Sequence, residues 1–284
     1  MRTIILAVIL ALVSAVAHAQ PYQFEAIPSF DHCGDSSLLD AQKNGITLGI
    51  SPSPPYSSID PQTSKAGGID VEINEAVLGW LRITKIHYVV APFGQLIPAL
   101  LAHRIDVIAT NIHYTPDRIK VISFSGPAWW YGPAIVVPKG NPDHITSFAM
   151  LNGRKVGAVT GTAQDEYLRH IGATVVPFTN QDEEFSAVTS GRVRMLLEDQ
   201  ILSVDFIKAN PNAPIEIAPD VVVPTELIYK YGYGYARYAL RKADCTLRAG
   251  YTAGLAEVRG VGEVSAILKK YGLSNHNLLF FPLQ

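Results

Sequence analysis

Two segments of the chain each place a charged side chain directly after an apolar run. Val107-Ile108-Ala109 is typical of a buried strand, and Thr115-Pro116-Asp117-Arg118 follows it with the residue types of a helix start. Further along, the apolar segment Val193–Leu197 ends at Glu198-Asp199. Ligands of open α/β sheets bind beyond the carboxyl ends of the strands, and a guanidinium fork at that place suits a carboxylate. Arg118 is therefore the first candidate for a ligand-binding residue.

The elements that must position Arg118 alternate between strand and helix patterns. In chain order we expect a strand at Ile46–Ile50, a proline-stiffened loop at Ser51–Tyr56, a hairpin tip at Ile59–Gly67, a helix at Ile69–Leu81, a strand at Ile86–Val90, a short helix at Phe93–His103 and a strand at Ile105–Ala109. This alternating order is typical of a doubly wound α/β sheet. The preceding segment, Pro21–Asp40, is polar and is predicted to be an irregular arm.

A second series of strands and helices surrounds Asp199. The expected strands are Ala134–Val137, Lys155–Val159, Thr174–Pro177 and Val193–Leu197, and Ile215–Val223 is expected to be extended. The expected helices are one that follows the segment Thr160–Gln164 and ends at about His170, and two more at Asp182–Ser190 and Ile201–Ala209. The Tyr- and Gly-rich segment Tyr229–Leu240 is predicted to be a strand that crosses back, and helices at Thr246–Val258 and Glu263–Tyr271 would complete the first lobe. Two lobes joined by two crossings form a cleft, which is where a small ligand binds.

We therefore divide the chain into a signal peptide, residues 1–19, an N-terminal arm, residues 20–44, lobe 1, residues 45–131 and 235–284, and lobe 2, residues 132–234. Arg2, the apolar run Ile4–Val16 and the small residues of Ala17-His18-Ala19 are typical of a cleaved secretory signal. No Cys follows that site, so no lipid anchor is expected there. No later segment reaches the roughly 18 apolar residues of a membrane span. We expect an exported, periplasmic protein.

Charge and cysteine content exclude several classes of function. The net charge of −2 gives no basic footprint for nucleic acid. Cys33 and Cys245 are expected to form a disulfide in an exported chain, with two free thiols as the alternative. The cysteines and histidines show no metal-ligand spacing, and the turn at Thr160–Thr162 lacks the phosphate-binding pattern of a P-loop. No metal or other cofactor is expected.

Six segments in order resemble one family across nearly the whole mature chain. The chain resembles the periplasmic solute-binding proteins of ABC transporters for polar amino acids and related compounds. The segments that carry the resemblance are GIDVEINEAV (Gly68–Val77), PFGQLIPALLAHRIDVIAT (Pro92–Thr110), TPDR (Thr115–Arg118), VISFSGPAWWYG (Val121–Gly132), VGAVTGTAQDEYL (Val156–Leu168) and GRVRMLLED (Gly191–Asp199). The resemblance implies the type II periplasmic-binding fold, in which two α/β lobes with mixed sheets are joined by two hinge crossings.

The resemblance also implies a role for each candidate residue. Arg118 would bind the α-carboxylate of the ligand, and Asp199 would bind its α-amino group from the facing lobe, so that only the closed form holds both ends. Backbone N–H groups at a helix start would bind the same carboxylate; they belong to Gly161, Thr162, Ala163 and Gln164. The pocket lining would be formed by Thr110, Asn111 and His113, with Tyr56 and Phe93 as aromatic walls.

The chain departs from the family pattern at two places that concern the ligand. The loop Ser51–Pro55 lacks the acidic and aromatic residues that binders of basic amino acids usually carry, and Ala163 replaces a common hydroxyl residue. Both departures argue against a lysine- or arginine-type ligand. His113 with its aromatic neighbours resembles the arrangement in ectoine-type compatible-solute binders.

Each candidate also has a simpler structural interpretation. Arg118 could form a surface ion pair with Asp117, and Asp199 could cap the helix that follows it, with Glu198 as the alternative ligand group. Trp129-Trp130-Tyr131 is expected to pack the hinge. For His113, Tyr56 and Phe93, the alternative is that each side chain is an ordinary buried core residue without contact to a ligand.

Three functional hypotheses follow. The leading one is a monomeric binding protein that captures a small zwitterionic solute and delivers it to an ABC permease. The runner-up is an enzyme on the same fold, resembling an exported cyclohexadienyl dehydratase, with a general acid among Glu198, Asp199 and His113. A sensory module is the third, and the absence of a further domain after Gln284 argues against it.

Overall fold

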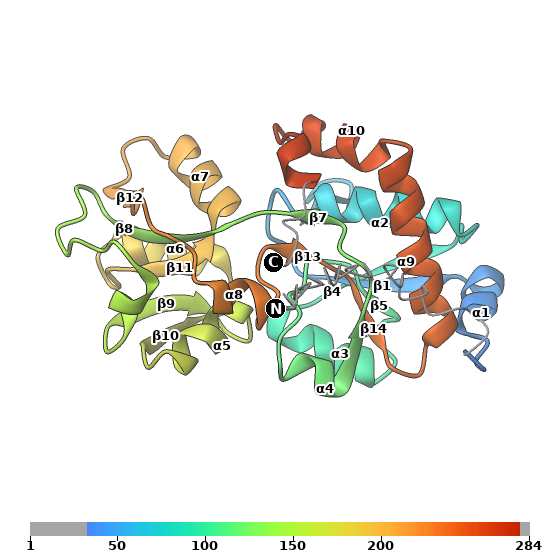
Figure 1. Cartoon of the computed structure of the whole chain (residues 1–284). Helices are drawn as coiled ribbons and strands as arrows, with labels where there is room; N and C mark the ends of the chain where they lie inside the picture. Colours follow the sequence, from blue (N-terminus) through green and yellow to red (C-terminus); the bar gives the residue numbers. More distant parts are fainter. Residues whose placement is uncertain (1–32, 279–284) are drawn as a thin grey trace, which may run out of the picture.

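The computed structural model describes residues 33–278, which form two lobes, each built around a five-stranded mixed sheet (Figure 1). In the first sheet the strand order is β4 (Ile86–Val90), β1 (Ile46–Ile50), β5 (Val107–Ile108), β14 (Ala239–Arg241) and β6 (Ile122–Phe124). The first three strands are parallel, and β14 runs antiparallel to both of its neighbours. We call the part built around this sheet lobe 1.

Helices from both ends of the chain cover the first sheet. They are α1 (Ser37–Asn44), α2 (Ile69–Trp80), α3 (Leu96–Leu101), α4 (Arg118–Val121), α9 (Cys245–Gly260) and α10 (Glu263–Lys270), with 3-10 turns at Phe93–Gln95 and Asn275–Leu278 and a small hairpin of β2 (Ser58–Ile59) and β3 (Ala66–Gly67). Helix α2 buries Ile69, Ile73 and Val77 completely, and it packs against α9 and α10. Its apolar stripe is the reason that this segment folds as a helix on the sheet.

The second sheet has the strand order β10 (Thr174–Phe178), β9 (Lys155–Val159), β11 (Leu196–Asp199), β8 (Pro133–Pro138) and β12 (Ile215–Ile217). Its helices are α5 (Ala163–His170), α6 (Gln181–Thr189), α7 (Gln200–Ala209) and α8 (Thr225–Tyr229), with a 3-10 turn at Phe148–Leu151. Strand β9 is parallel to β10 and β11, whereas β8 is antiparallel to β11 and β12. We call this part lobe 2. The α/β fold with two mixed sheets confirms the expected fold class.

Two chain crossings connect the lobes and lie side by side. Strand β7 (Trp129–Trp130) leaves lobe 1, strand β13 (Tyr235–Ala236) returns to it, and the two pair antiparallel (Figure 1). Gly234 precedes the second crossing with φ 86°, and a Cβ atom there would lie 2.3 Å from the Tyr131 carbonyl oxygen. Only glycine fits this close approach of the crossings. The exact domain boundaries remain a prediction.

Two expectations about the site-bearing region of lobe 1 are corrected. The segment Phe93–His103 is not one helix but a 3-10 turn followed by α3, which ends at Leu101. The helix after Thr115 begins at Arg118, so Pro116 is not its first residue. Thr115 still contributes locally, since its hydroxyl accepts a hydrogen bond of 3.4 Å from the Arg118 backbone N–H.

Two further expectations fail at the ends of the lobes. Pro21–Asp40 was expected to be irregular; residues 21–32 lie outside the described residues, but the last part is wrong, since α1 begins at Ser37 and buries Ala41. Tyr229–Leu240 was expected to be one strand, but it holds the end of α8 and two short strands, β13 and β14. Positive φ angles at Gly232 and Gly234 interrupt this segment.

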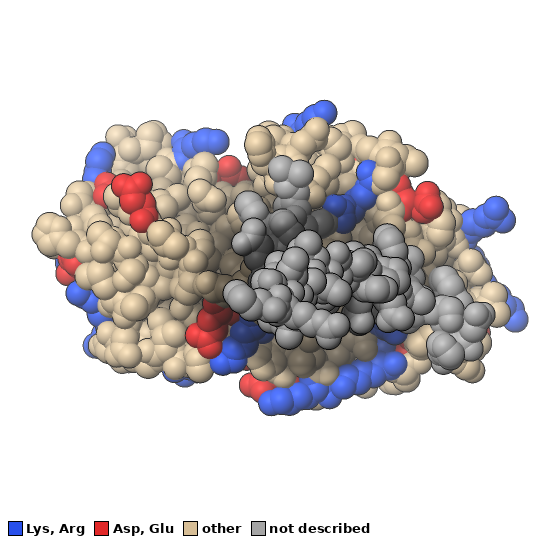
Figure 2. All heavy atoms as spheres, in the orientation of Figure 1, with Lys and Arg blue, Asp and Glu red and all other residues tan. Residues whose placement is uncertain are grey.

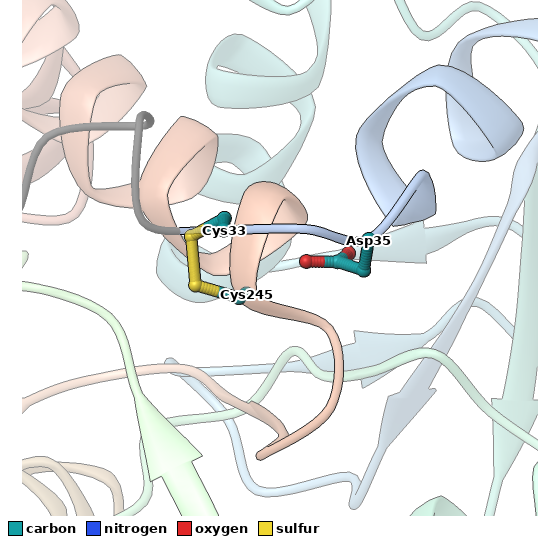
Figure 3. Close-up of side chains that lie close together, drawn as sticks. All are labelled: Cys33, Asp35 and Cys245. Atoms are coloured by element: carbon teal, nitrogen blue, oxygen red, sulfur yellow. A yellow bond between two sulfur atoms is a disulfide. The ribbon is translucent and has the colours of Figure 1, made fainter.

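The expected disulfide is confirmed between Cys33 and Cys245, with 5.4 Å between the Cα atoms (Figure 3). Asp35 lies beside it, and its carboxylate accepts hydrogen bonds from the backbone N–H groups of Ser37 and Thr246, both 3.0 Å long. Burial opposes ionisation, but the hydrogen bonds from Ser37 and Thr246 prevail and lower the pKa of Asp35 to about 2. The N-terminal segment is thereby fixed to the start of α9.

The signal-peptide prediction, residues 1–19, lies outside the described residues. Within residues 33–278, no helix combines the length and the apolar character that a membrane crossing requires. On the face drawn in Figure 2, charged side chains form small groups, mainly along the edges of the lobes.

Candidate functional site

A small cavity of about 30 Å³ lies where the two lobes meet. Lobe 1 contributes Ser51, Ser53, Tyr56, Phe93, Thr110, Asn111 and His113, and lobe 2 contributes Thr162, Gln164, Gln181, Glu198 and Asp199. Eight of the eleven residues to which the resemblance gives a role in ligand binding therefore line one cavity. The other three, Arg118, Gly161 and Ala163, do not line it and are described below.

Arg118 is buried and bridges the lobes. One terminal nitrogen, Nη1, donates a 2.8 Å hydrogen bond to the His113 carbonyl, and the other, Nη2, donates a 2.6 Å bond to the Gly161 carbonyl of lobe 2. Its guanidinium carbon lies 5.3 Å from the centre of the Phe93 ring. Burial lowers the pKa of Arg118 to about 10, so the side chain is still a cation at neutral pH.

The surface-pair interpretation of Arg118 is wrong, because Asp117 pairs with Lys120 instead and Arg118 is only 5% exposed. Within residues 33–278 its guanidinium has hydrogen bonds to backbone carbonyls but no ion pair with a carboxylate. Buried charges in proteins are normally compensated by an opposite charge. We therefore expect the buried guanidinium of Arg118 to bind an anionic group of a ligand.

The start of α5 faces the cavity from lobe 2. Thr162 is the N-cap, and its hydroxyl accepts a 3.2 Å hydrogen bond from the Asp165 N–H. The N–H groups of Gly161 and Thr162 are used internally, by the Asp165 carboxylate and the Val159 carbonyl. Within the described part of the chain, the N–H groups of Ala163 and Gln164 have no such partner. These two N–H groups are the ones left to bind an anion at this helix start.

Asp199 ends β11 and stands at the N-cap position of α7, but its side chain makes no capping hydrogen bond. The helix-cap interpretation of its carboxylate is therefore wrong. Its Oδ1 atom instead accepts hydrogen bonds from the Tyr233 hydroxyl and, at 3.1 Å, from Gln164 Nε2. The carboxylate is held toward the cavity by a residue of the returning crossing and a residue of α5.

Two more buried carboxyl groups lie beside Asp199. Glu198 accepts hydrogen bonds from the Asp199 backbone N–H at 2.6 Å and from Gln164 Nε2 at 3.4 Å, and Glu184 of α6 lies behind it without exposure. Burial raises the pKa of Glu184, Glu198 and Asp199, and the Glu198 charge raises those of Glu184 and Asp199 further. No cationic side chain within residues 33–278 forms an ion pair with any of the three. This wall of the cavity is a place for a cation or a hydrogen-bond donor.

His113 is both a buried, hydrogen-bonded residue and part of the cavity wall. Its Nε2 lies 2.8 Å from the Tyr131 hydroxyl, which is also 2.8 Å from Asn111 Oδ1. The imidazole ring stacks on Tyr233, with 4.4 Å between ring centres and 16° between planes. Burial, and then the nearby charges of Arg118 and Arg237, lower its pKa, so His113 is neutral.

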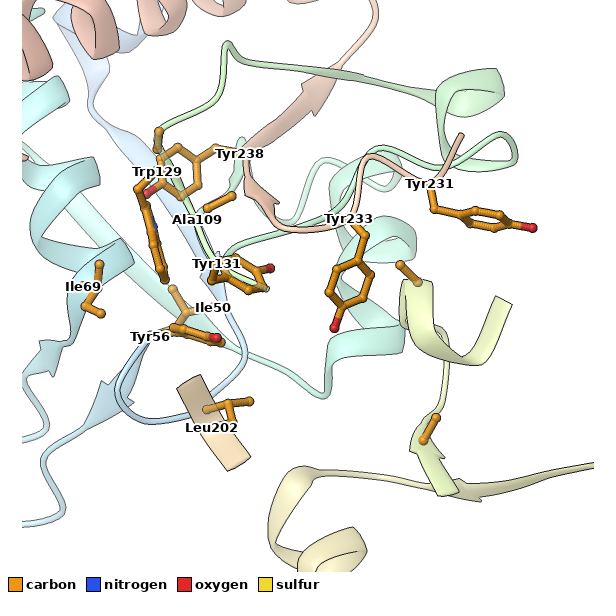
Figure 4. Close-up of a cluster of buried hydrophobic side chains, with 14 of the residues drawn as sticks. Ile50, Tyr56, Ile69, Ala109, Trp129, Tyr131, Leu202, Tyr231, Tyr233 and Tyr238 are labelled. Carbon is orange, nitrogen blue, oxygen red and sulfur yellow. The ribbon is translucent and has the colours of Figure 1, made fainter. Parts of the chain in front are cut away.

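Aromatic rings from the β1–α2 loop and the first crossing pack around the cavity (Figure 4). Tyr56 lies 5.5 Å from both Trp129 and Tyr131, measured between ring centres. Tyr56 is only 2% exposed, and burial together with the nearby charge of Asp199 raises the pKa of its hydroxyl. It is therefore a core residue whose hydroxyl lies near Asp199 at the cavity.

Asp70 of α2 connects this aromatic cluster to the site. Its Oδ1 accepts 3.1 Å hydrogen bonds from Trp129 Nε1 and the Tyr238 hydroxyl, and its Oδ2 accepts a 2.8 Å bond from the Asn111 N–H. The carboxyl group is completely buried, and burial raises its pKa to about 7. Both crossings and the site strand are thus fixed to one side chain.

Sequence reasoning missed Tyr131, Tyr233, Asp70 and Gln181 as residues around the site. Tyr131 and Tyr233 lie in the hinge segments. The many tyrosines there indicate that rings pack together, but the sequence does not show which of the rings lies next to the cavity. Asp70 begins a helix, where an acid normally faces water. The burial of its carboxyl depends on side chains more than 40 residues away, and no local pattern encodes it.

Comparison with known proteins places this geometry in a family. Residues 46–274 match the family model of bacterial extracellular solute-binding proteins, family 3. The chain is 29% identical over 222 residues to the lysine/arginine/ornithine-binding periplasmic protein of Escherichia coli, which covers 76% of this chain and 83% of that protein.

Two solved structures extend the comparison. An ancestral arginine-binding protein bound to arginine has 29% identity and a TM-score of 0.69, covering 80% of this chain and 97% of its own. An ancestral amino acid-binding protein that is a precursor of cyclohexadienyl dehydratase has 25% identity and a TM-score of 0.70, covering 83% and 99%. Since the family match spans most of the chain, this protein belongs to the bacterial extracellular solute-binding proteins, family 3.

Proposed function

We propose that this protein captures a zwitterionic amino acid, or a close derivative of one, in the cavity between its lobes and delivers it to an ABC permease. One observation carries the proposal. Two buried ionisable side chains of opposite sign meet at the cleft: Asp199 of lobe 2 lines the cavity, and Arg118 of lobe 1 is hydrogen-bonded to the cavity residue His113 and, across the lobes, to Gly161. Neither side chain has an ion-pair partner within residues 33–278.

A zwitterion would compensate both charges at once. Its carboxylate would bind Arg118 together with the N–H groups of Ala163 and Gln164, and its ammonium would bind Asp199 and Glu198. The curated relative from Escherichia coli is named for binding lysine, arginine and ornithine, which supports an amino acid as the ligand class. Because the two charged ends are held by different lobes, binding would favour the closed form through its higher affinity for that form.

The test is a calorimetric binding screen with the twenty standard amino acids, ornithine, citrulline, ectoine and opines. We expect saturable binding of at least one amino acid, and a thermal shift that rises with its concentration. Absence of binding by every amino acid and derivative, with folded protein, would contradict the proposal.

The proposal includes a cleaved signal peptide at residues 1–19, a periplasmic location and a monomeric state. Mass spectrometry of protein recovered from the periplasm would locate the new N-terminus, expected at Gln20. Light scattering behind a sizing column would measure the mass. A membrane-bound form or a dimer would correct these parts without affecting the ligand site.

A second candidate, an exported enzyme, rests on the raised pKa values of Glu198 and Asp199. Burial raises the pKa of both groups, and a carboxyl group with a raised pKa can act as a general acid beside a bound ligand. The similarity to the precursor of cyclohexadienyl dehydratase gives this candidate a concrete reaction to test. Incubation with prephenate or arogenate distinguishes the candidates, since release of the aromatic product would favour the enzyme and its absence the binding protein.

A further inference from the structure

A second, larger hollow of about 250 Å³ adjoins the cavity at the cleft. The side chains of Ser53 and Gln181 line both spaces, so the two spaces meet at these residues. Ser53 belongs to the loop after β1 in lobe 1, and Gln181 is the first residue of α6 in lobe 2. Like the cavity, the hollow is therefore formed by both lobes.

Ser53 provides an unused polar atom at the junction of the two spaces. It is only 8% exposed, and within residues 33–278 its hydroxyl has no hydrogen-bond partner. Buried hydroxyl groups are normally satisfied by protein, water or a ligand. A molecule that extends from the cavity into the hollow would pass this hydroxyl.

The floor of the hollow is apolar. Phe185 of α6 and Phe206 of α7 stack with 4.3 Å between ring centres and 8° between planes, and Leu202 lies on the same wall. Pro52 and Pro54 form the opposite side, from lobe 1. Figure 4 draws Leu202 of lobe 2 below Tyr56 of lobe 1 in the same buried cluster, which marks where this wall approaches the cavity. These surfaces suit the methylene groups of an extended side chain.

The rim of the hollow is acidic. Asp182 of α6 and Asp205 of α7 both line it and are exposed. Within the described residues, neither carboxylate has a hydrogen bond or an ion pair with another side chain, and no Lys or Arg lines the hollow. The rim therefore attracts a cation and repels an anion.

We propose that this hollow binds the side chain of the ligand, and that this side chain is long, with an apolar stem and a cationic end. The inference rests on the proposed function, because the amino-acid head must first occupy the cavity. The two spaces meet at Ser53 and Gln181, so a side chain attached to a head group in the cavity can extend into the hollow. The stem passes between Ser53 and Gln181, and the cation lies at Asp182 and Asp205.

This inference revises the expectation drawn from the loop Ser51–Pro55. The loop carries no acidic residue, which argued against a ligand with a basic side chain. In the folded chain, the acids lie across the cleft from that loop, on the first turn of α6 and on α7. The charge that the loop lacks is supplied by the facing lobe.

The first experiment compares arginine with citrulline, which has nearly the same shape but no charge on its side chain. By calorimetry at low ionic strength, we expect the intact protein to bind arginine about tenfold more tightly. In the double variant Asp182→Asn, Asp205→Asn, the preference for arginine should fall to about twofold or less. Asp220→Asn is the matched control, since Asp220 is an exposed lobe 2 residue that lines neither space, and it should keep the preference.

The second experiment fills the hollow from a residue that does not line the cavity. Ala209→Trp places a large ring at the last residue of α7, which is exposed and lines the hollow. We expect arginine binding to weaken at least tenfold, while alanine binding changes less than twofold, because alanine needs only the cavity. Circular dichroism checks that the variant is folded.

The outcomes separate this inference from the proposed function. Equal affinity for arginine and citrulline, or an equal effect of Ala209→Trp on arginine and alanine, would overturn the hollow as a side-chain site while amino-acid binding stands. Tighter binding of short neutral amino acids than of arginine would do the same. If no amino acid binds at all, both the inference and the proposed function are wrong.

Discussion

Arg118 already donates two hydrogen bonds to backbone carbonyls, so its guanidinium is fixed before any ligand arrives. We expect Arg118→Ala to weaken amino-acid binding by about 2–5 kcal/mol, because a buried carboxylate would lose its charged partner. Calorimetry measures the loss, and a near-native circular dichroism spectrum shows that the fold remains. Arg118→Lys keeps the charge but not the fork, so it should recover only part of the affinity. Unchanged affinity in Arg118→Ala would remove this residue from the site.

The carboxylate of Asp199 does not cap α7. A substitution of Asp199 can therefore change the ligand affinity without removing a helix cap from the fold. We expect Asp199→Asn to cost about 2–5 kcal/mol of binding free energy if it faces the ligand ammonium. The loss of thermal stability should be small in comparison, because Asn can still accept from Tyr233. A binding loss under about 0.5 kcal/mol, which is typical of exposed pairs, would place the ammonium elsewhere.

Asp70 makes the stability of the fold dependent on pH. Burial raises its pKa from the ordinary 3.8 to about 7 in the folded state, so the folded chain holds this proton more tightly than the unfolded chain. The contribution of Asp70 is therefore most favourable below about pH 4 and is lost as the pH rises through 7, by about 4 kcal/mol in total. Urea unfolding at pH 5 and pH 8 should show the larger part of this decrease, about 3 kcal/mol.

Asp70→Asn is the matched variant for that pH dependence. It keeps a hydrogen-bond acceptor for Trp129 and Tyr238 but loses the titration. We expect it to be less stable than the natural chain at pH 5 and to show a smaller decrease between pH 5 and pH 8. The same decrease in both proteins would assign the pH dependence to another group, such as Glu184 or Glu198.

At the scale of elements, the disulfide fixes the segment before α1 to the start of α9, on the side of lobe 1 away from the cleft (Figures 1 and 3). We expect the double variant Cys33→Ser, Cys245→Ser to lose about 2–5 kcal/mol of stability. Its ligand affinity should change less than twofold, because the bond contacts no residue of the cavity. Thermal unfolding with and without a reductant, followed by calorimetry, tests both parts. A large loss of affinity would indicate that α9 is coupled to the site.

The sequence predicted most elements because their patterns are local. Strands such as Ile46–Ile50 and Lys155–Val159 are short apolar runs, and the helical stripe of Ile69–Trp80 has the right spacing over a full element. It failed at Tyr229–Leu240, where glycine conformations and pairing with β7 decide the path of the chain. The helix α1 was missed because its stability comes from packing on α9 and from Asp35.

For the candidate site, too, the sequence indicated single residues but not the geometry that depends on contacts between the lobes. The family resemblance pointed to Arg118 and Asp199, and chain order placed both after strands. The hollow beside the cavity could not be predicted, because it depends on how α6 and α7 stand against the loop after β1. Contacts between lobes join residues far apart in sequence, and no local pattern encodes their geometry.

At the scale of the whole molecule, the lobes approach each other backbone to backbone. A Cβ atom on Gly94 of lobe 1 would lie 3.4 Å from the Thr160 carbonyl oxygen of lobe 2. We expect Gly94→Val to hold the cleft slightly open and to weaken ligand binding at least tenfold, while the unfolding temperature of the unliganded protein changes little. Small-angle X-ray scattering with saturating ligand should then show less compaction than in the natural chain. Full compaction in the variant would mean that this contact does not limit closure.

The paired crossings have a mechanical consequence. Because β7 and β13 are hydrogen-bonded to each other, they form one ribbon and not two independent tethers. We therefore expect the lobes to open mainly by rotation about one axis. One pair of fluorescent labels, with one dye on each lobe, should then report the whole opening angle. A second pair placed elsewhere should change in strict proportion to the first at every ligand concentration.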